Sequence, residues 1–199
     1  MVLLDSPLKF DETAHRYYLN GTPVPSVTRV FEYTGLVNYG FLGERRDEYL
    51  ERGRIVHLAT RHDDEGVLVE SSVPLDLRGY LQAWRAFRND YAFVPVLIEH
   101  RVFHAEHGFA GTLDRTGRIG DGTEIILDIK SGLAPAAVRY QLAAYAACLP
   151  HPRTRFRRCV ELHRDASYKV IPHETSDYQR DLNTFLEALT AYKARRGEE

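Results

Sequence analysis

The chain has 199 residues, of which 44% are hydrophobic and 27% charged, a composition that excludes a disordered, collagen-like or coiled-coil protein. The 26 basic and 28 acidic residues give a formal net charge of −2, so no overall positive field marks a nucleic-acid binder. Two cysteines are too few for a disulfide scaffold or for the four thiolates of an all-cysteine iron–sulfur cluster. No apolar run is long enough for a membrane span and no signal peptide is evident, so we expect a cytoplasmic protein, in a host cell if viral.

The first half of the chain predicts a small β-hairpin followed by helices. Residues 8–24 contain two short strands and the turn signal Asn20-Gly21. Helical spacing of apolar residues then predicts three helices, which lie between Ser26 and Gly35, from about 42 to 62, and from 75 to 92.

After Pro95 the apolar pattern changes to the alternation that is typical of strands. Gly-containing turns separate three β-rich runs into an antiparallel meander, which a helix and then a strand pair and a last helix follow. The predicted ranges are 96–104, 109–119 and 123–132 for the meander, 134–149 for the helix, 155–165 and 167–173 for the pair, and 177–196 for the last helix. We expect one α/β domain over residues 1–199, with a central mixed sheet flanked by helices.

The meander carries the residues with the clearest chemistry. Asp128 and Lys130 are two apart on one strand, so their side chains share a face, while Leu127 and Ile129 point to the other, buried side. Asp114, on the preceding strand, can bring a second carboxylate to the same place. Two carboxylates and a lysine suit divalent-metal hydrolysis of a phosphodiester, although an isolated D-x-K is more often an ordinary surface ion pair.

Two helices offer further polar groups. Gln141 and Tyr145 lie four residues apart, and therefore on one face of an alanine-rich helix. His57 follows Gly53 by one turn on the long helix, where the missing side chain allows a close approach. Taken singly, a helical histidine is more often a surface or core residue than a ligand, and Tyr145 could simply fill the core.

Four motifs follow one another between Gly53 and Tyr145: G-x-x-x-H on a helix, G-x-x-D, D-x-K after an apolar run, and Q-x-x-x-Y on the next helix. In this order they resemble the RecB-like exonuclease branch of the PD-(D/E)xK nuclease superfamily. The opening hairpin and the VPSVT segment resemble small phage-type members. This resemblance implies a restriction-endonuclease-like core and covers most of the chain.

The resemblance implies a role for each matching residue. His57, Asp114, Asp128 and the backbone carbonyl of Ile129 would bind Mg²⁺, for which Mn²⁺ could substitute, and Lys130 would be the catalytic lysine. Further candidates are Glu99 as a metal ligand and, for DNA binding, Gln141, Tyr145, Arg54 and Arg139. No iron–sulfur cluster is expected, because the four cysteines of cluster-bearing relatives are absent.

Other clusters have simpler explanations. His100 and His104 would lie about 13 Å apart along a strand, too far to share one zinc ion. The arginine-rich segment from 153 to 158 could bind phosphates or form a solvated strand face. The spacing of Tyr80, Trp84 and Phe87 favours core packing over base stacking.

We therefore expect a magnesium-dependent DNA nuclease, an exonuclease of DNA processing, recombination or repair. The expected partners are DNA and a second protein that acts in recombination or replication. We expect no association with a membrane. Two alternatives stay open: a catalytically silent module that binds DNA or a partner, and an endonuclease of the same superfamily.

Overall fold

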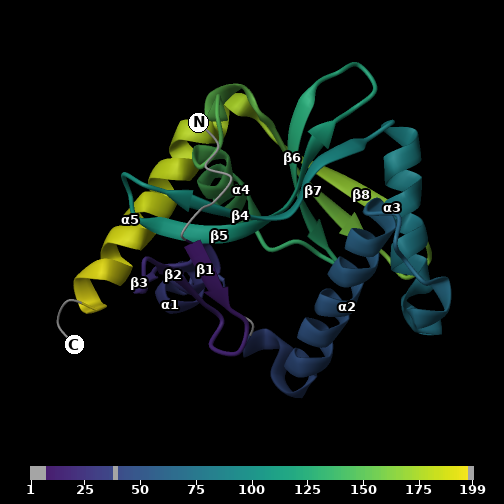
Figure 1. Cartoon of the computed structure of the whole chain (residues 1–199), viewed down its shortest axis with the longest axis horizontal. Helices are drawn as coiled ribbons and strands as arrows, with labels where there is room; N and C mark the ends of the chain where they lie inside the picture. Colours follow the sequence, from purple (N-terminus) through teal and green to yellow (C-terminus); the bar gives the residue numbers. More distant parts are fainter. Residues whose placement is uncertain (1–7, 38–39, 197–199) are drawn as a thin grey trace.

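The computed structural model describes residues 8–37 and 40–196 (Figure 1). Its centre is a five-stranded sheet in the order β4-β5-β6-β7-β8. The strands are β4 (Val94–His104), β5 (Phe109–Arg118), β6 (Glu124–Lys130), β7 (Phe156–Leu162) and β8 (Tyr168–His173). Neighbours pair antiparallel except β6 and β7, which are parallel and joined through a helix. The predicted meander and strand pair are therefore confirmed.

Helices cover both faces of the sheet, so the expected α/β architecture with a central mixed sheet flanked by helices is confirmed (Figure 1). The α-helices are α1 (Val27–Thr34), α2 (Arg46–Asp64), α3 (Arg78–Asp90), α4 (Val138–Ala147) and α5 (Tyr178–Arg196). Short 3-10 helices span Gly40–Arg45, Glu70–Ser72, Leu75–Leu77, Pro152–Thr154 and Thr175–Asp177. The first helix lies between Ser26 and Gly35 as predicted: the Ser26 hydroxyl accepts a hydrogen bond from Arg29 N at its start, and Gly35 ends it in the left-handed conformation.

Alternation along β6 divides the interior into two hydrophobic cores. Ile126 packs in the core under α1, α4 and α5, whereas Ile125, Leu127 and Ile129 pack in the core under α2 and α3. Figure 1 shows these two groups of helices on opposite sides of the sheet. Asp128 and Lys130 follow Ile126 at two-residue intervals, which assigns them to the face that α4 covers.

The N-terminal region forms a second sheet with one strand more than the expected hairpin. Its antiparallel strands are β1 (Leu8–Asp11), β2 (Arg16–Leu19) and β3 (Thr22–Val24). Asn20 and Gly21, both with positive φ, form the tight turn between β2 and β3. The Tyr17 hydroxyl lies 2.7 Å from Thr112 Oγ1, which fastens this sheet to β5.

The arginine-rich start of β7 is not the solvated strand face considered above. Arg157 is fully buried, because α5 covers this face, and its Nη1 donates to Asp181 Oδ2 at 2.8 Å. Arg139 Nε donates to the other oxygen of Asp181 at 2.7 Å. Asp181 is itself buried, and its carboxylate binds both guanidinium groups between β7, α4 and α5.

Replacing Asp181 by alanine leaves the buried Arg157 without its counter-charge, and we expect a loss of about 3–5 kcal/mol in the free energy of unfolding. Urea denaturation measures this loss. Arg180→Ala is the control, because the Arg180–Asp177 pair is largely exposed and should contribute less than about 1 kcal/mol. Equal effects of the two substitutions would contradict this assignment.

Candidate metal and nuclease site

The candidate site lies where the pairing of β5 and β6 is interrupted. Regular pairing extends from Arg118 and Glu124 to Arg115 and Leu127. At the next position the Asp114 side chain lies between the strands, and its Oδ2 accepts a hydrogen bond from Ile129 N at 2.7 Å. The carbonyl of Ile129 accepts from His57 Nε2 on α2 at 2.9 Å. Both main-chain polar groups of the buried Ile129 are therefore satisfied by side chains of the candidate site.

His57, Glu99 and Asp114 place one ligand atom each within 4.8 Å of one another. His57 Nδ1 lies 3.4 Å from Glu99 Oε1 and 3.8 Å from Asp114 Oδ1. Glu99 has φ 45°, a left-handed conformation that a residue other than glycine seldom adopts within a strand. An imidazole and two carboxylates are ligands for a divalent cation, so the sequence-predicted acids and histidine come together in three dimensions.

Asp128 and Lys130 form the second part of the site. Lys130 Nζ lies 2.7 Å from Asp128 Oδ2, and the thiol of Cys159 on β7 lies 3.7 Å from the same oxygen. Asp128 Oδ1 is buried and has no hydrogen-bond partner among the described residues. A buried carboxylate oxygen in this state is costly unless a ligand satisfies it, and a bound cation would do so.

The electrostatics of the site reflect burial and close opposite charges. Burial raises the pKa of Asp114 to about 6, and the nearby Asp128 carboxylate adds to that shift. Burial lowers the pKa of His57, but the carboxylates of Asp114 and Glu99 outweigh this effect and raise it to about 9. Burial likewise opposes the charge of Lys130, yet Asp128 and Asp114 hold the pKa of its ammonium above the ordinary value. The Asp128–Lys130 pair and the His57 cluster thus act on one another.

Gln141 and Tyr145 bring α4 to the same site. Gln141 Nε2 donates to the Tyr145 hydroxyl at 3.4 Å, and the phenol is buried. Burial raises the pKa of Tyr145, and Asp114 and Asp128 contribute to the shift. A Cβ at Gly111 would clash with Tyr145 Cε1, so the glycine of G-x-x-D leaves room for the tyrosine of Q-x-x-x-Y.

Arg54 and Arg139, both predicted to bind DNA, have protein carboxylates as partners. Arg54 donates to both carboxylate oxygens of Glu51 at 2.9 and 2.7 Å on the exposed side of α2. Arg139 is bound by Asp181 and Asp177 on the side of α5. The structure therefore brings neither guanidinium to the His57 cluster.

Arg52 is a residue near the site that the sequence analysis missed. Its Nε donates at 3.4 Å to Oγ of Ser131, the residue that follows Lys130. Its guanidinium lies over the rings of Tyr49 and Tyr80. A Cβ on the neighbouring Gly53 would be 3.9 Å from Ser131 Oγ, so α2 passes close to this loop. In the sequence, Gly53 indicates a close approach of α2 to another segment. It does not indicate which of its two neighbours, Arg52 or Arg54, faces the loop.

The other sequence clusters have structural roles. His104 and His107 stack on each other with ring centroids 4.7 Å apart, and His107 N donates to His104 Nδ1. Trp84, Tyr80 and Phe87 lie in the core under α2 and α3, as their spacing predicted.

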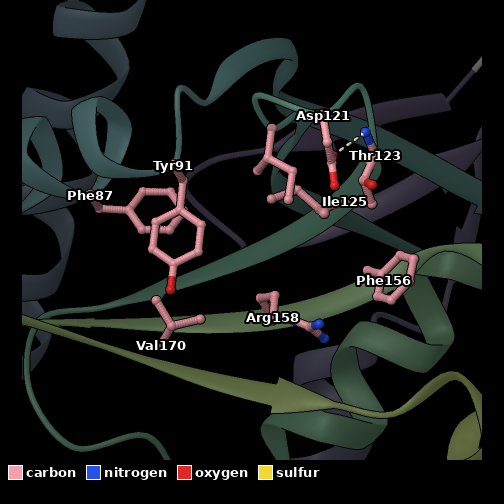
Figure 2. Close-up of a pocket in the computed structure, with 9 residues that line it drawn as sticks. Phe87, Tyr91, Asp121, Thr123, Ile125, Phe156, Arg158 and Val170 are labelled. Atoms are coloured by element: carbon pink, nitrogen blue, oxygen red, sulfur yellow. Dashed lines mark hydrogen bonds between the residues drawn. The ribbon is translucent and has the colours of Figure 1, made fainter.

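A separate cavity of about 160 Å³ opens between the β5–β6 turn, the end of α3 and the strands β7 and β8 (Figure 2). Its walls are mainly apolar, with Phe87, Tyr91, Phe156 and Val170 among them and the Arg158 guanidinium at one side. None of the metal, catalytic or DNA-binding candidates lines it. The cavity is therefore not part of the candidate site.

No protein-family model matches the sequence, and no curated protein matches it either. Among solved structures, the chain is similar to an alkaline exonuclease (LHK-Exo) from Laribacter hongkongensis, with 15% identity over 87% of this chain and 92% of that chain and a TM-score of 0.32. A structure of LHK-Exo in complex with dAMP gives 14% identity over 88% and 93% and a TM-score of 0.33. At such low similarity, function has to be argued from the site itself. Across residues 8–37 and 40–196, no helix has the length and apolar character needed to cross a membrane.

Because Asp114 belongs to the clustered ligands, Asp114→Asn should weaken Mn²⁺ binding by at least about tenfold, as loss of one carboxylate charge reduces the attraction for a hard cation. The amide oxygen can still accept from Ile129 N, so the fold should persist. Isothermal titration with Mn²⁺ measures the affinity, and Asp121→Asn in the β5–β6 turn is the control. Wild-type affinity in the Asp114 variant would contradict the ligand assignment.

Proposed function

We propose that the protein is a metal-dependent DNA nuclease that hydrolyses phosphodiester bonds, and that it acts as an exonuclease. One observation carries the proposal: His57, Glu99 and Asp114 place one ligand atom each within 4.8 Å of one another, and Asp114 interacts electrostatically with Lys130 and with Asp128, which has a buried oxygen without a partner among the described residues. Metal-dependent hydrolysis of a phosphodiester uses this combination of hard anionic ligands and a fixed cation.

His57, Glu99, Asp114 and Asp128 would hold the divalent cation, with the Ile129 carbonyl at the edge of the same group. Mg²⁺ is the cation that carboxylate-rich sites of phosphoryl-transfer enzymes use, and Mn²⁺ accepts similar ligands. When bound, the cation supplies a Lewis acid that polarises a phosphate oxygen and makes water more acidic.

The residues of the chain bind and orient the substrate. In the reaction, a water oxygen forms a bond to phosphorus, one of the two P–O ester bonds breaks, and the released oxygen takes up a proton. Lys130, held by Asp128, donates from Nζ to phosphate oxygens and stabilises the negative charge that accumulates on them. Gln141 and Tyr145 provide neighbouring polar groups from α4 that hold the DNA strand or order the site.

The decisive test of this function compares linear and circular DNA in the presence of Mg²⁺ or EDTA. An exonuclease degrades linear DNA progressively from its ends, requires the metal and leaves closed circles intact. Discrete cleavage of circles would instead identify an endonuclease. Binding of DNA without cleavage of either form would refute the nuclease proposal in favour of a binding module.

Lys130→Ala should reduce cleavage by roughly 10²–10³-fold, because it removes a preorganised cation from the charge that develops at phosphorus. The matched control is Lys169→Ala, since that lysine is exposed and 4.0 Å from Glu161. Single-turnover cleavage measures the rate, and Mn²⁺ titration shows whether the site is intact. Unchanged cleavage in the Lys130 variant, with metal bound, would remove the catalytic role from this residue.

Arg52, which has no carboxylate partner among the described contacts, is proposed to contact a DNA phosphate beside Lys130, whereas Arg54 is occupied by Glu51. Arg52→Ala should weaken binding of a DNA duplex and make the dependence of log affinity on log salt shallower by about 0.9, the contribution of one phosphate contact. Fluorescence anisotropy in EDTA measures this without cleavage. Arg180→Ala on α5, a residue outside the candidate site, should leave the slope unchanged; equal slopes for both variants would contradict the assignment.

A further inference from the structure

Arg115 is a charged side chain that lies entirely in the interior, directly behind the proposed metal ligands. Its side chain has no exposed surface. Its Nη1 donates to Glu99 Oε1 at 3.0 Å and to the main-chain carbonyl of Asp114 at 2.7 Å. Its Nη2 donates to Thr60 Oγ1 at 3.3 Å, and the Thr60 hydroxyl in turn donates to the carbonyl of His57 at 3.0 Å. One guanidinium therefore contacts or reaches all three members of the cluster.

On the opposite side, the same guanidinium is joined to the core. Arg115 Nε donates to Asp64 Oδ2 at 2.7 Å, and the Asp64 side chain is also fully buried. The indole of Trp84 donates to Asp64 Oδ1 at 3.0 Å, and Arg88 Nη1 lies 2.9 Å from that oxygen. Arg115 also lies over the Trp84 ring, 5.7 Å from its centroid. Asp64 thus links Trp84 to the guanidinium that holds the cluster.

The backbone of Glu99 shows that this network constrains the site. A left-handed φ of 45° in a strand persists only where surrounding contacts fix it, and the bond from Arg115 holds the Glu99 carboxylate in place. An ion pair with Asp64 alone would stabilise the core without involving Nη1. The two Nη1 bonds are directed instead at a ligand carboxylate and at the backbone that carries a second ligand.

We propose that Arg115 is a positioning residue, which holds Glu99, Asp114 and, through Thr60, His57 as a preformed ligand set for a divalent cation. Asp64 connects this set to Trp84, the chain's single tryptophan. The inference rests on the proposed metal-binding function of the cluster and adds to it the group that determines its geometry.

The test is the affinity for Mn²⁺ alone, measured by isothermal titration without DNA. Arg115→Lys keeps the positive charge but removes the planar fork that makes several bonds at once, and we expect the affinity to fall by about 10–100-fold. Arg157→Lys is the matched control, because Arg157 is the other guanidinium shown above to be fully buried and bound to a buried aspartate, and its contacts lie on α4, α5 and the segment before α5. That control should lose stability and keep wild-type Mn²⁺ affinity.

If Arg115 had only a structural role, both variants would lower the free energy of unfolding and neither would change the Mn²⁺ affinity. That result would overturn the proposal. Should Arg115→Lys fail to fold, Thr60→Val serves instead, because it removes only the hydroxyl between Arg115 and His57; it should lower Mn²⁺ affinity several-fold, and unchanged affinity would count against the proposal. Wild-type protein that binds neither Mn²⁺ nor Mg²⁺ would refute the metal site itself, which separates that failure from a failure of the role of Arg115.

Trp84 fluorescence provides an independent readout. Cation binding at Glu99 changes the electrostatic field at the indole, because Arg115 and Asp64 link Glu99 to Trp84. A Mg²⁺ titration should therefore shift the emission of the wild type and of Arg157→Lys at the concentration where calorimetry with Mg²⁺ reports binding. The shift should be absent in Arg115→Lys at saturating Mg²⁺. Binding by calorimetry without any emission change in the wild type would contradict the link to Trp84.

Discussion

The candidate site depends on the replacement of one sheet hydrogen bond by a side chain. Beyond Arg115 the strands β5 and β6 no longer pair, and Asp114 accepts the Ile129 N–H that lacks a backbone partner. A buried backbone N–H needs a hydrogen-bond acceptor, and in a regular sheet the neighbouring strand provides it. Here the Asp114 carboxylate is the acceptor, and this hydrogen bond holds it in the gap. The gap places the Asp114 carboxylate in the interior of the sheet. His57 lies beside it and donates to the Ile129 carbonyl, the other main-chain group of Ile129.

Alternation along β6 explains how the gap coexists with a stable core. Leu127 and Ile129 pack under α2 and α3, while Asp128 and Lys130 lie on the face that α4 covers. The parallel connection from β6 through α4 to β7 then brings Gln141 and Tyr145 back over the ends of these strands. The alternation of side chains along β6 and the β6–α4–β7 connection thus place both the apolar residues of the cores and the polar residues of the candidate site.

Much of this arrangement could be predicted from the sequence, because it depends on local patterns. Two-residue and four-residue spacings locate Asp128 with Lys130 and Gln141 with Tyr145 on common faces, and the meander and flanking helices follow from apolar period and turn residues. The partners of the arginines could not be predicted, since Arg115 meets Asp64 and Arg157 meets Asp181 across long sequence separations. Asp64 lies at the charged end of α2, and nothing in its local sequence indicates that its side chain is buried and accepts a hydrogen bond from Trp84 of α3.

The contact between Gly111 and Tyr145 joins two motifs that look independent along the chain. The tyrosine ring occupies the space where any larger residue at position 111 would place its Cβ. A residue with a side chain at position 111 therefore requires a smaller residue at 145 or a rearrangement of the site. In a set of related sequences these two positions should vary as a pair, and anyone who grafts this site onto another sheet has to move the helix and the strand together.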